Sequence, residues 1–301
     1  MAAALNEGLV MPGTQRPDAA VIIPHYNDVV RLERCLTVLA AGDLSGVDLV
    51  VVDNGSSQSL ERVQAAFPMV RFFTEPEKGA AAARNRGVRE TTAPVLLFID
   101  ADCIAAPDWL DVARRVAPKA DLVGGRVDVF DETPPPRSGA EAFEAVFAFN
   151  FRNYIEVQGF TGAGNLVTRR DVFEKVGDFT NGVSEDRDWS MRAVAKGFRL
   201  IYEDTMVVSH PSRSDWAALR HKWLRLTREL CASNGFSGRD RLRWGLRGLA
   251  MPISALAHLP KTLFSSKLTS PAERIAAAAT LMRLRFLRMA WMLRQAMGRS
   301  I

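Results

Sequence analysis

Six apolar residues at positions 94–99 run directly into the acidic tripeptide Asp100-Ala101-Asp102. An apolar run of this length that ends in polar residues is typical of a strand buried on both faces of a parallel sheet. Open α/β sheets bind ligands at the carboxyl ends of their strands, where these acids would lie. Two carboxylates separated by one small residue can hold a hard divalent cation. The tripeptide therefore predicts a metal site at a sheet edge, or alternatively two acids that cap the next helix.

The rest of the first half alternates short apolar runs with helical patterns. Strands are predicted at residues 20–23, 49–52, 70–73 and 95–99, and helices at 28–41, before 67 and at 79–89. This order is typical of βαβ units and a parallel sheet, so we expect an α/β fold. Further along we expect helices at 109–116, 140–150 and 185–196 and strands at 121–127, 198–202 and 206–208.

Charge is distributed unevenly along the 301 residues. Residues 210–301 contain 17 Lys or Arg and 4 Asp or Glu. Residues 1–209 contain 22 Lys or Arg and 30 Asp or Glu. Two helical stripes of apolar residues run through the basic part, at 216, 219, 223, 226 and 230 and at 275, 279, 282, 286, 289 and 293. Basic amphipathic helices fit an anionic membrane surface, and packing against the catalytic part is the alternative. Nucleic acid is not expected as a partner, because no recognised module surrounds the arginines.

Other features narrow the class of protein. Three isolated cysteines, at positions 35, 103 and 231, argue for a reducing compartment and against a disulfide framework or a zinc site. No apolar stretch reaches the roughly 18 residues of a membrane-spanning helix. We expect a cytoplasmic protein with a peripheral contact on the inner face of the membrane. Residues 1–18 are interpreted as a flexible leader, 19–212 as the catalytic domain and 213–301 as a helical basic extension.

Five segments, in order, resemble motifs of the family-2 glycosyltransferases. They are residues 21–27, 51–56, 78–87, 98–102 and 184–188. The resemblance covers roughly residues 19–212 and implies the GT-A fold, a Rossmann-like and mostly parallel sheet flanked by helices. It also implies metal-dependent, inverting transfer of a sugar from a nucleotide-diphosphate sugar. The second motif departs from the family at Asn54, Ser57 and Gln58, where acids are common, and this bears on the preference for base or sugar.

The resemblance implies a set of metal ligands. Asp102 is expected to bind Mg²⁺ or Mn²⁺, and Asp100 to contact the ribose or the metal. His210 follows a predicted strand, and in relatives with this layout a histidine here can complete the metal shell. The alternative for His210 is a lone histidine that a backbone group satisfies.

The resemblance also implies a nucleotide site. Asp53 is expected to hydrogen-bond the nucleobase, with Pro24 and Tyr26 beside it, and Arg84 is expected to meet a phosphate or to fix Asp53. The alternatives are an Asx turn at Asp53, a proline that merely ends a strand, and a solvated arginine on a helix.

A second acidic motif is expected to supply the general base. Inverting transfer needs one carboxylate near the acceptor hydroxyl, and by resemblance this is Asp186. Glu185 and Asp188 would then position it or pair with arginines. Acids at a helix N-terminus are also favoured by the helix dipole, which is the alternative. Glycines 162 and 164, with Asn165, lie where the family's acceptor and diphosphate loop falls.

The sequence thus predicts a glycosyltransferase that acts on a carbohydrate or lipid-linked acceptor in polysaccharide or glycolipid biosynthesis. The alternative is a non-catalytic nucleotide-sugar-binding protein on the same fold. The second acidic motif separates the two hypotheses, because a protein that only binds the donor has no need of a base. A nucleotidyltransferase is disfavoured, because His25-Tyr26-Asn27 replaces the glycine-rich loop that it would carry after the first strand.

Overall fold

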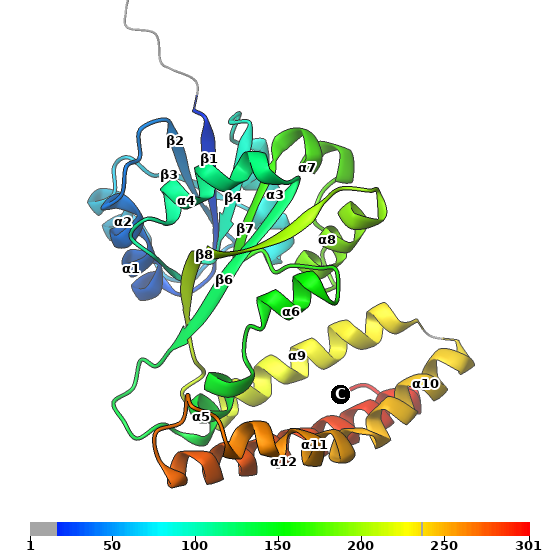
Figure 1. Ribbon diagram of the computed structural model, residues 1–301. Coiled ribbons are helices and arrows are strands. Elements are labelled where there is room, and N and C mark those ends of the chain that lie inside the picture. The colour runs from blue at the N-terminus through cyan, green and yellow to red at the C-terminus, as the bar shows by residue number, and fades with distance from the viewer. Residues whose placement is uncertain (1–16, 236) are drawn as a thin grey trace, which may run out of the picture.

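The computed structural model describes residues 17–235 and 237–301 of the chain. Its described residues form one eight-stranded sheet with helices on both faces and a group of helices at the C-terminal end (Figure 1). The strands are β1 (Ala19–His25), β2 (Val47–Asp53), β3 (Arg71–Thr74), β4 (Val95–Ile99), β5 (Ile104–Ala105), β6 (Leu122–Phe130), β7 (Asn165–Arg169) and β8 (Leu200–Pro211). The helices are α1 (Val29–Ala40), α2 (Glu61–Ala66), α3 (Ala80–Arg89), α4 (Trp109–Val116), the 3₁₀ turn η1 (Ala117–Lys119), α5 (Gly139–Phe147), α6 (Phe151–Glu156), α7 (Arg170–Val176), α8 (Glu185–Ala195), α9 (Trp216–Asn234), α10 (Gly238–Leu249), α11 (Met251–Leu263) and α12 (Pro271–Ala296).

The sheet has the order β3-β2-β1-β4-β7-β6-β8-β5, and the predicted α/β fold is confirmed. Strands β3, β2, β1 and β4 run parallel, β7 runs antiparallel to both of its neighbours, and β8 runs parallel to β6. The chain leaves β1 toward β2 on one side and later returns to β4 on the other. A ligand crevice forms at such a reversal of strand order, beyond the carboxyl ends of the strands.

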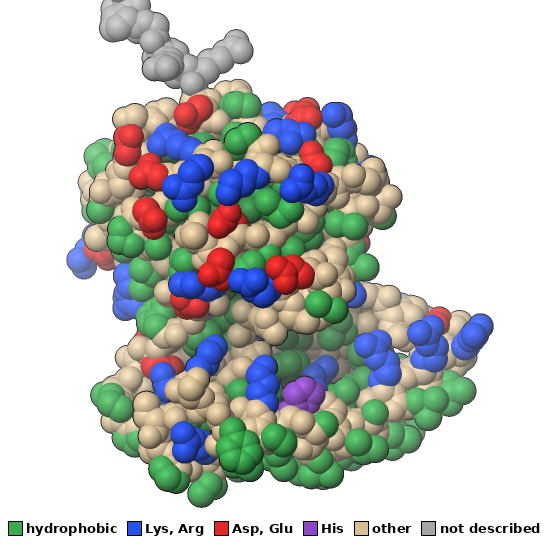
Figure 2. All heavy atoms as spheres, in the orientation of Figure 1, with side chains coloured by type: hydrophobic (Ala, Val, Ile, Leu, Met, Phe, Trp, Pro, Cys, Tyr) green, Lys and Arg blue, Asp and Glu red, His purple; other side chains and the backbone are tan. Residues whose placement is uncertain are grey.

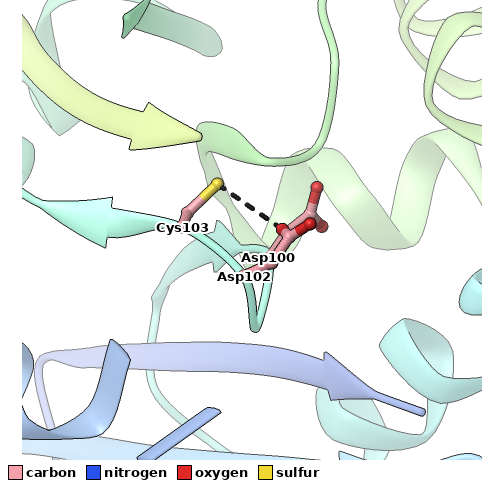
Figure 3. Close-up of side chains that lie close together, drawn as sticks. All are labelled: Asp100, Asp102 and Cys103. Atoms are coloured by element: carbon pink, nitrogen blue, oxygen red, sulfur yellow. Dashed lines mark hydrogen bonds between the residues drawn. The ribbon is translucent and has the colours of Figure 1, made fainter. Parts of the chain in front are cut away.

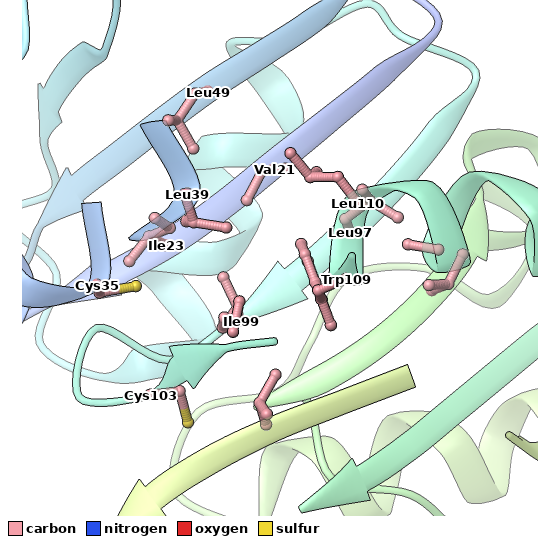
Figure 4. Packing of buried hydrophobic residues seen from close by; sticks show 14 of the residues in the cluster. Val21, Ile23, Cys35, Leu39, Leu49, Leu97, Ile99, Cys103, Trp109 and Leu110 are labelled. Atoms are coloured by element: carbon pink, nitrogen blue, oxygen red, sulfur yellow. The ribbon is translucent and has the colours of Figure 1, made fainter. Parts of the chain in front are cut away.

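Alternate residues of the central strands supply two hydrophobic cores. Val21, Ile23 and Ile99 face α1, α2 and α4, where they pack with Trp109 and other buried side chains (Figure 4). Ile22, Leu96 and Phe98 face the other way, toward α3, α7 and α8. This two-sided burial explains why the strands read as continuous apolar runs. It also fixes the polar ends of β1, β2 and β4 at one edge of the sheet.

The C-terminal helices pack on one another and on α5, which comes from the middle of the chain. Phe143 of α5 lies with Leu219 of α9, Ala255 of α11, and Leu281 and Leu284 of α12 in one buried cluster. The apolar residues predicted to line one side of α9 are therefore partly buried, as the packing alternative predicted. None of the helices in residues 17–235 and 237–301 is long and apolar enough to cross a membrane.

The stripe predicted on α12 does not form the buried face of that helix. Ile275 and Phe286 are exposed, and the helix packs instead through Ala277, Leu281 and Leu284. Arg288, which the pattern placed off the apolar stripe, is also buried, with its guanidinium 4.5 Å from the Trp223 ring centroid. Two faces of α12 thus carry apolar residues, and the periodicity alone could not tell which one is inside.

Three predicted elements need correction. The two strands expected at 198–202 and 206–208 are one strand, β8, because a bulge opposite Gly125 and Arg126 absorbs the exposed polar residues between them. The helix expected at 140–150 ends at Phe147, and a separate helix, α6, begins at Phe151. Residues 1–16 of the expected leader lie outside the described residues.

Candidate active site

The two acids of the metal motif follow β4, as predicted, and point into the same space (Figure 3). The backbone turns after the strand, where the N–H of Cys103 donates to the carbonyl of Asp100 at 3.0 Å. Ligand atoms of Asp100, Asp102 and Cys103 lie within 4.8 Å of one another. Asp100 and Asp102 retain about a third and a quarter of their side-chain exposure, so both carboxylates are reachable from outside.

His210, at the end of β8, meets this motif from another part of the sheet. Its Nε2 atom lies 3.2 Å from Oδ2 of Asp102. Burial raises the pKa of Asp102, but the nearby His210 together with Arg213 and Arg31 outweighs burial and brings it to about 2. Asp102 is therefore ionised at neutral pH, as a metal ligand must be.

The donor set fits a hard divalent cation. Burial and the two neighbouring carboxylates raise the pKa of the Cys103 thiol well above its ordinary value, so the sulfur stays protonated and is a poor ligand. Two carboxylates and an imidazole remain, and such oxygen-rich sets suit Mg²⁺ or Mn²⁺ better than a soft metal. The ring of His210 is also oriented as metal ligands usually are, because its Nδ1–H donates to the carbonyl of Pro211 at 2.7 Å.

Asp53, at the end of β2, is held by a network of hydrogen bonds from His25 and Ser56. The backbone N–H of Asp28 donates to Nε2 of His25, so Nδ1 carries the proton and donates to Asp53 at 3.0 Å. Ser56 donates to the same carboxylate through its hydroxyl and its N–H. Burial raises the pKa of Asp53, but the bonds from Ser56 and His25 outweigh it and hold the pKa below its ordinary value. A fixed, ionised acceptor results, suited to the N–H groups of a nucleobase.

Pro24 and Tyr26 lie beside Asp53 at the end of β1. β1 pairs with β4 only as far as Ile22, so Pro24 lies where one side of the strand has no neighbour and the missing N–H costs nothing. Tyr26 is 57% exposed, an unusual state for an aromatic side chain at a sheet edge. The Lys78 ammonium lies 4.9 Å from the ring centroid, and its donors reach the carbonyls of Asn54 and Gly55.

Arg84 of α3 joins the metal motif to the second acidic motif. Its guanidinium donates to Asp100 at 2.6 Å and to Glu185 at 2.7 Å, and its side chain is 5% exposed. Burial lowers the pKa of Arg84, but the surrounding acids outweigh it and keep the group charged. Arg84 does not contact Asp53, so the prediction that it could fix Asp53 is wrong. The reason is the direction of α3, which places this side chain at the end of β4.

Asp186 lies in the first turn of α8, next to the acid that Arg84 holds. Its burial and the charge of Glu185 raise its pKa to about 6, against the opposing effect of Arg84 and of the Arg187 N–H. The N–H of Arg187 donates to its Oδ1 at 2.6 Å. Burial raises the pKa of Glu229 on α9; Arg225 opposes this, and the two acids of α8, Glu185 and Asp186, add to the rise.

Two glycines let the backbone approach these acids. A Cβ atom at Gly164 would lie 2.6 Å from Oδ2 of Asp100. A Cβ at Gly162 would lie 2.7 Å from the ring of Phe151 and 3.3 Å from Oδ2 of Asp186. The glycine-rich loop thus lies between the metal motif and the second acidic motif. Asn165 has a different place: it is fully buried and bonded to Trp109 and to the carbonyls of Arg126 and Met206.

Asn54 and Asn85 are positioning residues whose contacts could not be read from the sequence. Asn54 donates to the carbonyls of Glu75 and Glu77 and accepts from the N–H of Gly79, which ties the loop after β2 to the start of α3. Asn85 exchanges two hydrogen bonds with the backbone of Phe179 and so anchors the segment that leads to α8. The departure at Asn54 therefore serves the loop geometry around Asp53.

Comparisons with known proteins show which family the chain resembles. A family model for glycosyl transferase family 2 matches residues 20–177, just over half of the chain. The glycosyltransferase AglE of Haloferax volcanii is 30% identical over 208 residues, which cover 65% of this chain and 68% of that protein. A pre-mycofactocin glycosyltransferase of Mycobacterium tuberculosis is 26% identical over 290 residues, which cover 89% of this chain and 61% of that protein.

The fold is also similar to that of a solved enzyme. The mannosyltransferase PcManGT from Pyrobaculum calidifontis, in complex with GDP-Man and Mn²⁺, matches with a TM-score of 0.55 at 18% identity. The match covers 96% of this chain and 77% of that one. With the five motifs in order, the acids gathered at one sheet edge, and the family model matched over residues 20–177, the chain belongs to glycosyl transferase family 2.

Proposed function

We propose that this glycosyltransferase transfers a sugar from a nucleotide-diphosphate sugar to an acceptor hydroxyl, with inversion and with a divalent cation. One observation carries the proposal: Arg84 bonds Asp100 and Glu185 at once. This bridge ties the end of β4 to the start of α8, so the acids for the donor and the acid for the acceptor share one site. A protein that only bound the donor would not need the second group.

The donor would be held at the carboxyl ends of β1, β2 and β4. Asp102 and His210 would bind Mg²⁺ or Mn²⁺, with Asp100 on the metal or the ribose. When bound, the cation would neutralise the charge that develops on the departing diphosphate. Asp53 would accept from the nucleobase, with Pro24 and Tyr26 beside it. The binding of GDP-Man and Mn²⁺ by PcManGT supports this choice of ligands.

Asp186 would act as the general base. It would accept the proton of the acceptor hydroxyl while that oxygen bonds to the anomeric carbon of the sugar. The bond from that carbon to the phosphate oxygen would break, and its electron pair would leave with the diphosphate. A single displacement of this kind inverts the anomeric centre. A base with a pKa of about 6 is ionised at neutral pH and still basic enough to take the proton.

The acceptor would enter through a cleft between the sheet and the C-terminal helices. The cleft has a volume of about 600 Å³ and is lined by aromatic and basic side chains, among them Phe149, Phe151, Tyr202, Arg126, Arg152 and Lys261. Phe151 also lies against Gly162 beside Asp186, and Phe149 lies 4.6 Å from the ring of His210. Aromatic faces suit sugar rings and the basic groups suit a phosphate, so both a carbohydrate and a lipid-linked acceptor are proposed.

We also propose the limits of the domains, the class of pathway and the cellular location of the protein. We assign residues 19–212 to the catalytic domain and 213–301 to a helical extension, noting that α5 of the first packs into the second. Participation in polysaccharide or glycolipid biosynthesis fits an acceptor cleft of this composition. A cytoplasmic location, with a peripheral contact on the membrane, fits the three free cysteines.

A transfer assay tests the proposal. Purified protein with Mn²⁺ is incubated with a panel of nucleotide-diphosphate sugars and two acceptors, a free oligosaccharide and a sugar linked to polyprenyl diphosphate, and the released nucleoside diphosphate is measured. We expect release with one donor and one acceptor class, and a loss of about 10²–10⁴-fold in Asp186→Asn. Asp188→Asn is the matched control, because Asp188 lies on the same helical turn but pairs with Arg192. Equal rates in the two variants would exclude Asp186 as the base.

A further inference from the structure

Helices α10 and α11 carry an exposed apolar stripe that the reaction does not use. Its members recur at steps of three and four, so they lie on one side of two helices that only Ala250 separates. All five are more than half exposed: Leu242, Leu246, Leu249, Ile253 and Leu256. Ile253 is 70% exposed and Leu242 64%. We call these five residues the apolar stripe.

The apolar stripe faces away from the packed side of its helices. On α10 the buried residues are Trp244, Gly245 and Gly248, and a Cβ at Gly248 would lie 3.1 Å from Met292 of α12. By helical spacing the members of the stripe on α10 are centred about a third of a turn away from these buried residues. Figure 2 shows hydrophobic side chains gathered along the lower margin of the helical part, the side turned away from the sheet. A row of this length cannot be explained as scattered surface residues.

Basic side chains flank the apolar stripe. Residues 238–263 contain five basic groups, namely Arg239, Arg241, Arg243, Arg247 and Lys261, and one acid, Asp240. That acid is engaged at the helix N-terminus, where it accepts from the N–H and hydroxyl of Ser237. By helical spacing Arg239 and Arg243 lie within about a third of a turn of the centre of the stripe. The surface is therefore apolar along its centre and positive along its border.

We propose that the apolar stripe docks this protein on an anionic lipid surface. An interfacial helix buries its apolar side at the level of the head groups while its arginines and lysines meet the lipid phosphates. The stripe runs from residue 242 to residue 256, or roughly 21 Å of helix, which is long enough to lie along a membrane surface. The inference does not depend on the transfer reaction and assigns a role to helices outside the active site.

A contact between two copies of the chain fits the same surface less well. A two-fold contact places the same surface on both partners, so the arginines that border the stripe would face arginines. Within residues 238–263 the sequence offers no free acid to balance them. An anionic surface satisfies both the apolar centre and the positive border.

Co-sedimentation with vesicles tests the docking surface. The full chain is mixed with vesicles of phosphatidylcholine alone or of phosphatidylcholine and phosphatidylglycerol in equal parts. We expect binding to the anionic vesicles that weakens as salt is added. The double variant Leu246→Glu with Ile253→Glu should bind at least about tenfold more weakly. The matched control is Met69→Glu with Val157→Glu, two exposed apolar residues of the sheet-containing part, and it should bind like the wild type.

The outcomes separate the alternatives. Both stripe residues are exposed, so the variants should keep the wild-type circular dichroism spectrum and melting temperature. Binding that is lost only in the stripe variant supports the proposal. Failure of the wild type to bind either vesicle, or equal binding by both double variants, overturns it. If sedimentation velocity shows a dimer that the stripe variant dissociates, without vesicle binding, the stripe is a contact between copies and the proposal is wrong.

Discussion

The Nε2 atom of His210 lies 3.2 Å from Oδ2 of Asp102, although Asp102 follows β4 and His210 lies near the end of β8, far along the chain. The carbonyl of Pro211 accepts the proton on Nδ1, so Nε2 is the ring atom that faces the carboxylate. A divalent metal between these two atoms would bind both of them, and we propose that the pair holds one.

His210 should contribute directly to metal affinity. His210→Gln removes one of the facing atoms, and we expect the Kd for Mn²⁺, measured by electron paramagnetic resonance, to rise at least about tenfold. His221→Gln, an exposed histidine on α9, is the control. The same Kd in both variants would show that His210 is not a ligand.

Asp186 should set the acid limb of the activity profile. Because burial and Glu185 raise its pKa to about 6, kcat/KM should fall below that pH as the base becomes protonated. An acid limb near pH 4 would contradict the raised pKa, and the absence of an acid limb would contradict the assignment of the base.

The same shift predicts a gain in stability on mutation. A carboxyl group whose pKa is raised by folding binds its proton more tightly in the folded state. Its contribution is therefore favourable at low pH and is lost as the pH rises through about 6. Asp186→Asn should raise the free energy of unfolding at neutral pH by about 1–3 kcal/mol, with little difference below about pH 4. Denaturation with urea at the two pH values measures this, and a variant less stable at neutral pH would contradict the account.

Arg84 should control both the stability and the pKa of the acidic cluster. Arg84→Gln leaves Asp100 and Glu185 without their cation, so we expect a loss of about 3 kcal/mol in unfolding free energy and an acid limb shifted above pH 6. Arg84→Lys keeps the charge but cannot bond both acids, and it should shift the limb less. Arg89→Gln, on the exposed side of α3, is the control. If the pH dependence of kcat/KM is the same in Arg84→Gln as in the wild type, Arg84 does not influence the pKa of the base.

Tyr26 should support the nucleobase. Its exposed ring has little to pack against in the free protein, so Tyr26→Ala should cost little stability but weaken nucleotide binding about tenfold, the scale of one stacked base. Tyr26→Phe keeps the ring and should bind normally. Calorimetry with the preferred nucleoside diphosphate decides this, and equal affinities for the Ala variant and the wild type would remove Tyr26 from the site.

The order of strands and the acids that follow them could be predicted from the sequence, because buried parallel strands leave long apolar signals. Asp53, Asp100 and Asp186 lie where the motifs indicated. The partners of these acids could not be predicted. His25 reaches Asp53 and Arg84 reaches Glu185 only after the chain has folded, across separations of 28 and 101 residues.

The C-terminal helices show that the spacing of apolar residues does not by itself predict which face of a helix is buried. The stripe on α12 has regular spacing, yet the helix packs through Ala277, Leu281 and Leu284, and Ile275 is exposed. Which face is buried depends on the neighbours that reach it, here α11, which precedes α12 in the chain, and α5, which comes from the middle of the chain. The stripe on α10 and α11 is interrupted by arginines in the sequence and was recognised only from its exposure.

Isothermal titration with a panel of nucleoside diphosphates, with and without Mn²⁺, tests the central claim most directly. The account predicts that one diphosphate binds the wild type and the control Asp111→Asn only when Mn²⁺ is present, and that Asp102→Asn loses this binding. Binding of equal strength without the metal, or in Asp102→Asn, would contradict it, as would the failure of every diphosphate to bind.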